Sequence, residues 1–215
     1  MADWPNLHVS QHPAVRHKLG ILRDEKTEPK KFREVVRELS WLLGYEALAD
    51  AHTRPIDVPT PIEVMEGAEL ADRIGFIPIL RAGLGMVDAF LELMPTAEVW
   101  HLGLFRDEKT LRPVEYYNKL PNTSTVDLCL ILDPMLATGG TLIDAIRYLV
   151  DRGADDITAI TLISSPEGIL HVERSLADLA VPVALVTGAV DERLNDKGYI
   201  VPGLGDAGDR LYGVV

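Results

Sequence analysis

The sequence predicts an α/β fold in which a mainly parallel sheet is flanked by helices on both faces. Three observations predict it. From Ile74 onward, short apolar runs alternate with stretches of helical periodicity, the pattern of parallel strands joined by helical crossovers. The apolar run at 128–132 leads through a glycine-rich loop into a helical stripe that begins at Leu142. Hydrophobic residues make up 47% of the 215 residues, which is enough for one sizeable core, so we expect a single domain.

The N-terminal part of the chain predicts two helices and an extended segment. Apolar residues recur at helical spacing over 12–25. A second helix is expected to begin at Pro29, with Thr27 as its cap, because proline is favoured in a first helical turn. The segment 56–62 alternates in polarity but contains two prolines, which favour an edge strand or a projecting arm over the centre of a sheet.

From residue 74 the expected strands and helices alternate along the chain. Each expected strand is a short apolar run, and each expected helix shows three- and four-residue apolar spacing. We expect strands at 75–80, 98–105, 126–132, 157–163 and 181–186, a loop and helix at 83–94, a helix after residue 141, and a helix at 166–177.

The polar segment from Arg106 to Thr125 interrupts this alternation. It carries charges of both signs and lies between short strands. A long connection of this kind inside a compact domain is usually functional, as a lid or a hairpin. A solvated excursion without a function is the alternative, and the residues themselves do not separate the two.

The C-terminal segment 195–215 is rich in glycine, which indicates tight turns or backbone held close to a ligand. Tyr199, Ile200 and Leu211 make it too apolar for a free disordered end. We therefore expect the tail to be ordered.

The loop after the strand at 126–132 predicts a site for a phosphate and a ribose. In α/β proteins, ligands bind at the carboxyl ends of the strands, and the N-terminus of a helix binds anions through its free N–H groups. Asp133 ends the strand and can accept hydrogen bonds from sugar hydroxyls, and Ala137 to Thr141 form a small, glycine-rich loop before the helix. No lysine follows Gly139 and Gly140, so the loop is not that of a P-loop nucleotide triphosphatase.

A second strand-to-loop junction, at 79–86, suggests a second anion-binding loop. Its glycines allow backbone N–H groups to approach an anion, and Arg81 can add a bidentate positive charge. A single arginine near a strand end is more often a surface residue, so the residues alone leave the role of Arg81 open.

The composition excludes several classes of function. The net charge is 21 − 33 = −12, and a protein that binds nucleic acid needs a broad basic face. Cys129 is the only cysteine and lies in an apolar strand, so we expect a buried thiol and no internal disulfide. No apolar run reaches the roughly 20 residues of a membrane span, and the first ten residues do not resemble a signal peptide. We therefore expect a cytoplasmic protein that binds neither nucleic acid nor membrane.

Three motifs together resemble the uracil phosphoribosyltransferase family. They are LRAGLGM at 80–86, DPMLATGGT at 133–141 and GYIVPGLGDAGDR at 198–210, and they occur in the family's order. The resemblance implies a type I phosphoribosyltransferase-like fold with a flexible hairpin at 106–125 and a C-terminal base-binding hood. It implies one domain, made of N-terminal helices and an arm (1–73), a core that binds 5-phosphoribosyl 1-diphosphate, or PRPP (74–190), and a uracil-binding tail (191–215).

The family's reaction converts uracil and PRPP into UMP and diphosphate, and the resemblance implies a role for each motif. Arg81 and Arg106 correspond to arginines at the diphosphate end of PRPP, and Asp206 also reaches toward PRPP. Arg106 and Asp206 are the expected catalytic residues, although the sequence does not settle which group removes the N1 proton of uracil. The expected PRPP loop consists of Asp133, Pro134, Met135, Leu136, Ala137, Thr138, Gly139, Gly140 and Thr141, and the expected uracil site of Ile200, Gly205, Asp206 and Ala207.

The resemblance also implies how a metal takes part. Many members of the wider superfamily carry two adjacent acids at the strand end, whereas Asp133 is followed here by Pro134, as in the uracil enzymes. We therefore expect no metal site made by the protein alone, and expect Mg²⁺ to arrive bound to the diphosphate of PRPP.

Two other functions are compatible with the loop. One is a phosphoribosyltransferase for another base, such as a purine, which the tail motif disfavours. The other is a non-catalytic regulator that binds PRPP, nucleotide or RNA, and the charge of −12 disfavours RNA. The resemblance further implies a homo-oligomer, dimer or tetramer, with contacts from the N-terminal helices and the arm at 54–61, and activation by GTP as in part of the family.

Overall fold

The computed structural model of the chain describes residues 4–106 and 113–214, without the side chains of residues 105, 106 and 113. Its centre is a sheet in which every pairing but one is parallel, as predicted. In spatial order the strands are β1 (Leu7–Val9), β12 (Val183–Thr187), β10 (Ile157–Thr161), β8 (Leu128–Leu132), β4 (Ile74–Leu80), β6 (Leu102–Arg106) and β7 (Pro113–Asn118), and β5 (Glu98–Val99) pairs with β4.

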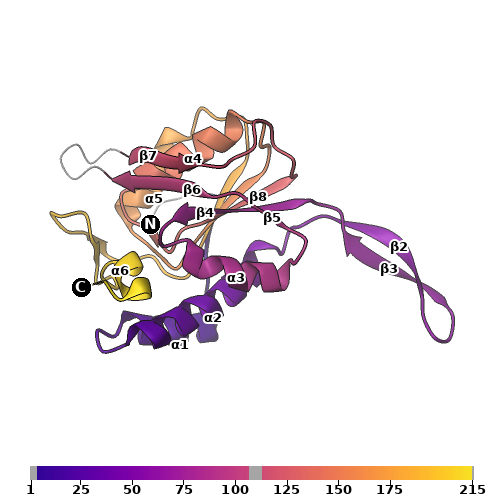
Figure 1. Ribbon diagram of the computed structural model, residues 1–215, viewed down its shortest axis with the longest axis horizontal. Coiled ribbons are helices and arrows are strands. Elements are labelled where there is room, and N and C mark those ends of the chain that lie inside the picture. The colour runs from indigo at the N-terminus through magenta and orange to yellow at the C-terminus, as the bar shows by residue number, and fades with distance from the viewer. Residues whose placement is uncertain (1–3, 107–112, 215) are drawn as a thin grey trace.

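Helices cover both faces of this sheet (Figure 1). The residues of β4, β8 and β10 are almost all buried, which explains why each reads as a continuous apolar run and not as an alternating one. One core cluster lies beneath α1 (Pro13–Arg23), α2 (Pro29–Ala47) and α3 (Leu84–Leu93), and a second beneath α4 (Gly140–Val150) and α5 (Pro166–Ser175). The fold class predicted from the sequence is confirmed.

The N-terminal helices begin close to the expected residues. Pro29 opens α2 as predicted. The prediction that Thr27 caps this helix is wrong: the residue at the cap is Glu28, and no side chain bonds there. The Thr27 hydroxyl instead donates to the carbonyl oxygen of Ile21 over 2.6 Å, so it closes the turn between α1 and α2.

Two of the expected strands are each divided in two. The segment expected at 98–105 breaks because β5 pairs with the start of β4 and β6 with its end. The segment expected at 157–163 breaks after Thr161, where Leu162 donates its N–H to the carbonyl oxygen of Pro134 and the chain leaves the main sheet. The next residues form β11 (Ile163–Ser164), which pairs with β9 (Met135–Leu136) in the loop after β8.

Two antiparallel pairs lie outside the main sheet. The arm is a hairpin of β2 (Thr53–Pro59) and β3 (Val64–Leu70) that projects from the body of the molecule (Figure 1). Prolines at both ends of β2 are tolerated because this strand has a partner on one side only. In the tail, β13 (Arg193–Leu194) pairs with β14 (Ile200–Val201), and α6 (Ala207–Tyr212) follows.

Part of the polar segment that interrupts the alternation forms one strand of a hairpin. Strands β6 and β7 pair antiparallel from Leu102 opposite Asn118 to Arg106 opposite Pro113, with a register shift between Gly103 and Leu104. The hairpin alternative is therefore confirmed for its two strands, and residues 107–112 lie outside the described part.

Two further expectations concern the core and the membrane. Cys129 is 1% exposed, and burial raises the pKa of its thiol to about 12, so the expected buried thiol is confirmed.

Over residues 4–106 and 113–214, we find no helix with the length and apolar character needed to span a lipid bilayer.

Candidate active site

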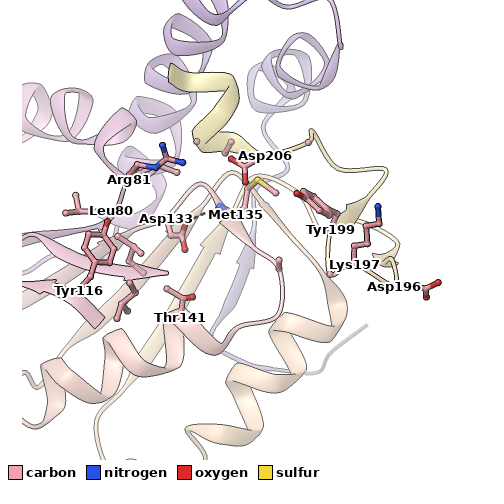
Figure 2. A pocket seen from close by; sticks show the side chains of 18 residues that line it. Leu80, Arg81, Tyr116, Asp133, Met135, Thr141, Asp196, Lys197, Tyr199 and Asp206 are labelled. Carbon is pink, nitrogen blue, oxygen red and sulfur yellow. Dashed lines mark hydrogen bonds between the residues drawn. The ribbon is translucent and has the colours of Figure 1, made fainter. Parts of the chain in front are cut away.

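A large open cavity of about 1190 Å³ lies at the carboxyl ends of β4 and β8. Its walls come from four places that are far apart in the chain: the end of β4 with the loop after it, the β6–β7 hairpin, the loop after β8, and the glycine-rich tail. Figure 2 shows Asp133 near the middle, with Tyr116 on the hairpin side and Tyr199 on the tail side. This is the edge of the sheet at which α/β proteins bind their ligands.

The loop after β8 presents alternate residues to the cavity. Asp133, Met135 and Ala137 line it, whereas Leu136 is 3% exposed and packs in the core. The alternation arises because Met135 and Leu136 form strand β9, in which successive side chains point to opposite sides. Pro134 is buried, and its carbonyl oxygen accepts the N–H groups of Leu162 and Ile163, so it fastens the loop to the segment that follows β10.

The loop ends at the N-terminus of α4, which has the geometry of an anion site. Gly139 precedes the helix with φ of 85°, and a Cβ there would lie 2.9 Å from the carbonyl oxygen of Gly168, so only glycine fits. No side-chain cap bonds to this end of α4. Its first N–H groups are therefore free to bind an anion, and Thr141 in the first turn lines the cavity.

Helix α5 and its N-cap residue, Ser165, hold the same loop through hydrogen bonds. The hydroxyl of Ser165 donates to the carbonyl oxygen of Ala137 over 2.6 Å and accepts the N–H of Gly168 over 2.9 Å. The ring of His171 hydrogen-bonds through Nδ1 to the carbonyl oxygen of Thr138 over 2.7 Å. The bonds from Ser165 and His171 to the loop both end on carbonyl oxygens of the loop. They therefore leave its N–H groups available to bind a ligand.

Asp133 has an unusual environment for a carboxylate. Burial raises its pKa from 3.8 to about 7, and the N–H of Met135, 3.5 Å from Oδ1, offsets only part of this. Of the residues that the structure describes, none forms an ion pair with it. A ligand that brings hydroxyl donors or positive charge would lower this pKa, so the site favours such a ligand.

Arg81 follows β4 and lines the opposite wall. The turn that carries it needs Gly83, since a Cβ there would lie 2.3 Å from the carbonyl oxygen of Leu132 on β8. The peptide bond between Leu80 and Arg81 is cis. The guanidinium of Arg81 pairs with Asp209 of α6 over 3.6 Å, and the hydroxyl of Tyr212 donates to the carbonyl oxygen of Arg81 over 3.2 Å.

The glycine-rich tail closes the cavity on its remaining side. Gly205, Asp206 and Ala207 line it, as expected. Asp206 is also the N-cap of α6, because its Oδ1 accepts the N–H of Asp209 over 2.8 Å. Ile200 is 4% exposed, packs in the core, and is not among the residues that line the cavity.

The structure thus brings together most of the expected site residues. Arg81, Asp133, Met135, Ala137, Thr141, Gly205, Asp206 and Ala207 share one cavity, whereas Pro134, Leu136, Thr138, Gly139, Gly140 and Ile200 support or adjoin it. Arg106 ends β6, and its side chain lies outside the described part.

Several lining residues were not predicted. Leu80 ends β4, Leu104 lies in the middle of β6, Tyr116 belongs to the hairpin, and Asp196 to Tyr199 form the turn before β14. The composition of the tail already indicated backbone near a ligand, so the turn at 196–199 could have been included. Tyr116 could not, because its place depends on the pairing of β6 with β7.

Comparison with known proteins agrees with this arrangement. The sequence model of the family described as uracil phosphoribosyltransferase matches residues 9–214. A uracil phosphoribosyltransferase of Roseiflexus sp. (strain RS-1) is 56% identical over 205 residues, which is 95% of this chain and 97% of the relative.

Two solved structures resemble the fold. The AQ2163 protein of Aquifex aeolicus superposes with a TM-score of 0.90 at 41% identity, over 97% of this chain and 98% of that one. An adenine phosphoribosyltransferase of Thermoanaerobacter pseudethanolicus superposes with a TM-score of 0.50 at 13% identity, over 75% of this chain and 84% of that one, and so shows the fold alone. The family match covers nearly the whole chain, and the chain belongs to the uracil phosphoribosyltransferase family.

Proposed function

We propose that this chain transfers the 5-phosphoribosyl group of PRPP to N1 of uracil, releasing diphosphate and forming UMP, a step of pyrimidine salvage. One observation carries the proposal: a single cavity joins an anion-binding helix N-terminus, a carboxylate at a strand end, an arginine loop and a glycine-rich tail. These four features match, in order, a phosphate, a ribose, a diphosphate and a nucleobase. The names of the relatives support the same reaction.

The PRPP half of the proposed site is built on the loop after β8. The N–H groups at the start of α4 would bind the 5′-phosphate, since Thr138 to Thr141 lead into that helix end. Asp133 would accept hydrogen bonds from the ribose hydroxyls. Arg81, and Arg106 at the end of β6, would bind the diphosphate, on which negative charge grows as it leaves.

The chemistry requires one bond to break and one to form at C1 of the ribose. The bond from C1 to the diphosphate oxygen breaks with its electron pair on the diphosphate, N1 of uracil bonds to C1, and the N1 proton is lost. Between these events the ribose resembles an oxocarbenium ion. Holding both reactants in line contributes on the order of several kcal/mol toward such a step, and the four walls of the cavity would provide that alignment.

The tail would recognise uracil through its backbone. The edge of uracil alternates acceptor, donor and acceptor, which backbone N–H and carbonyl groups at Gly205 to Ala207 can match. Cytosine places an amino group where uracil has O4, so a backbone donor at that point would lose its partner, and such mismatches discriminate strongly. Asp206 is our candidate acceptor of the N1 proton, and it also fixes the tail by capping α6.

The residues present fit Mg²⁺ that is carried by the substrate. Among residues 4–106 and 113–214, no group of three or more His, Cys, Asp or Glu side chains could hold a metal ion. Asp133 is the carboxylate of the cavity nearest the strand ends, and it would face the metal–PRPP complex. Bound on the diphosphate, Mg²⁺ would supply positive charge to the leaving group.

The β6–β7 hairpin would exclude water from the reaction. Leu104 and Tyr116 already contribute to the cavity wall, and Tyr116 is 51% exposed. Closure of the hairpin over bound PRPP would bury this surface and protect the oxocarbenium-like ribose from hydrolysis.

A nucleobase panel tests the proposed reaction. The chain is incubated with PRPP, Mg²⁺ and, separately, uracil, cytosine, adenine or hypoxanthine, and mononucleotides are separated by chromatography. We expect UMP from uracil and no product from the other bases. Absence of UMP would contradict the proposed function, and a purine mononucleotide in its place would assign the cavity to another base.

The remaining expectations stay predictions. We propose one functional domain divided at residues 73 and 190, a cytoplasmic location, and a homodimer or tetramer in solution. The arm supports an oligomer because Ile62, Val64 and Met65 expose apolar side chains on it. Light scattering tests the assembly, and the rate of UMP formation with and without GTP tests the activation by GTP that we also propose.

A further inference from the structure

The uracil-binding tail is fastened at its start by a buried ion pair. Asp191 accepts hydrogen bonds from both terminal nitrogens of Arg23: Nη1 lies 2.7 Å from Oδ2, and Nη2 lies 2.5 Å from Oδ1. The Asp191 side chain is 3% exposed and that of Arg23 is 24% exposed. A two-point contact between a guanidinium and a carboxylate fixes orientation as well as distance. The pair therefore forms a rigid unit between the end of α1 and the segment after β12.

Both side chains of this pair also hold Gly203. Its N–H donates to Oδ2 of Asp191 over 2.8 Å, and its carbonyl oxygen accepts from Nη1 of Arg23 over 2.8 Å. Gly203 has φ of 65°, and a Cβ there would lie 2.1 Å from the carbonyl oxygen of Ile200, so no other residue fits. The ion pair thus forms hydrogen bonds with both the N–H and the carbonyl oxygen of Gly203. Gly205, two positions later, is the next residue that lines the cavity.

A second arginine holds the far end of the same segment. The guanidinium of Arg210 donates to the carbonyl oxygens of Leu22, Asp24 and Thr27, in and just after α1, and to that of Leu204. The segment 203–210 is therefore fastened at both ends to the turn between α1 and α2.

The PRPP half of the cavity touches α6 through Arg81, which pairs with Asp209 and accepts from the hydroxyl of Tyr212, but it is otherwise anchored elsewhere. Its loop is held by Ser165 and His171 of α5, on the other face of the sheet from α1. Asp191 touches that side only through its backbone, whose N–H donates to the carbonyl oxygen of Ser164 over 2.8 Å. A change in the Asp191 side chain would leave this bond in place, so the loop after β8 can keep its position when the tail is perturbed.

We infer that Arg23 and Asp191 are positioning residues for the nucleobase: acting through Gly203, they set where the backbone at 205–207 meets uracil. Neither residue lines the cavity. The inference rests on the proposed function. Its physical basis is that a group which orients a substrate must be placed closely. A displacement of such a group by about 1 Å can lower the reaction rate about 100-fold. Loss of the ion pair would free Gly203 and move the backbone donors away from the base, while the phosphate loop stayed in place.

Substitution of either partner tests the inference. In Arg23→Gln and Asp191→Asn we expect KM for uracil to rise about tenfold or more, with KM for PRPP within about twofold of the unmodified chain. The rise in Tm that Mg-PRPP produces should be retained, since it reports the other half of the cavity. Because the two side chains act as one unit, the double variant should be no worse than the more impaired single variant.

A control and a milder variant sharpen the test. Lys18→Gln removes an ion pair with Glu38, 2.8 Å long, on the same helix but away from the tail, and should leave KM for uracil unchanged. Arg23→Lys keeps the charge but loses the two-point contact, so its KM for uracil should lie between that of the unmodified chain and that of Arg23→Gln. If Arg23→Gln does not fold, Arg23→Lys carries the test.

Two results would overturn the inference: an unchanged KM for uracil in folded variants, or equal rises in KM for both substrates. Either is distinct from failure of the proposed function, in which the unmodified chain would form no UMP at all.

Discussion

Arg81 and Asp209 form an ion pair that links the loop after β4 to helix α6 of the glycine-rich tail. Nη2 of Arg81 lies 3.6 Å from Oδ1 of Asp209, and both side chains are about half exposed. An exposed pair of this length contributes less than about 1 kcal/mol. An incoming diphosphate, with more charge and better geometry, would therefore displace Asp209 readily. The two walls of the cavity are in contact, but this contact does not hold Arg81 away from a ligand.

Arg81→Ala and Arg106→Ala should each lower kcat/KM for PRPP by about 100-fold, because each removes a charged donor from the departing diphosphate. Steady-state kinetics at varied PRPP measure this. Arg16→Ala, an exposed arginine on α1, is the control and should have no effect. An unchanged kcat/KM for PRPP in either variant would mean that its role at the diphosphate is wrongly assigned.

Asp133 should give the free enzyme a titration near pH 7. Its pKa is raised by burial to about 7, so kcat/KM for PRPP should fall as the pH drops below 7 and the carboxyl takes up its proton. In Asp133→Asn that fall should be absent, and activity should be low at every pH. A pH profile of both proteins in the same buffers separates this titration from that of PRPP itself.

The same carboxyl should make stability depend on pH in a defined direction. The folded pKa lies above the ordinary value of 3.8, so the folded state binds the proton more tightly than the unfolded state. Stability contributed by this group is therefore full below about pH 4 and is lost as the pH rises to about 7. Asp133→Asn should be the more stable protein at pH 8, by at most about 4 kcal/mol, with the difference vanishing near pH 4. Denaturant unfolding at both pH values measures it, and a less stable variant at pH 8 would indicate a structural role.

Gly139→Ala should lower kcat/KM for PRPP much more than Gly153→Ala does. The two glycines have nearly equal φ, 85° and 84°, so the backbone cost of alanine is similar, about 1 kcal/mol in each. They differ in their surroundings: a Cβ at Gly139 meets Gly168 at 2.9 Å, whereas nothing lies within 4 Å at Gly153. Equal losses of activity would show that the effect comes from stability and not from the phosphate loop.

The arm should determine the assembly of the chain. Ile62 is 90% exposed and Val64 is 63% exposed, both on a hairpin that projects from the body (Figure 1). If they pack against a second copy, the double variant Ile62→Glu and Val64→Glu should shift the mass in light scattering toward the monomer. Ile62→Val, which keeps the apolar surface, should not. An unchanged mass in the charged variant would exclude the tip of the arm as a contact.

Much of the cavity lining could be predicted from three motifs because the lining residues of each wall are close together in sequence. A strand end, a glycine loop and a helix start are consecutive residues, so Asp133 and Gly139 were identifiable without tertiary contacts. Within the loop, however, the sequence did not separate the residues that line the cavity from those that are buried. The prediction assigned every residue from Asp133 to Thr141 to PRPP, and that assignment stays a prediction. Leu136 is buried in the core, because β9 adds a short strand there and its side chains alternate.

By itself, the sequence determined the fold class and the phosphate loop, because the periodicity of apolar residues and the demands of glycine at positive φ act over a few neighbours. Only the tertiary structure decided which distant segments meet. It placed Tyr116 of the hairpin and Tyr199 of the tail on one cavity, and it closed Arg23 and Asp191, 168 positions apart, around Gly203. Such contacts depend on how strands pair and how helices pack across the sheet, and no local pattern in the chain encodes them.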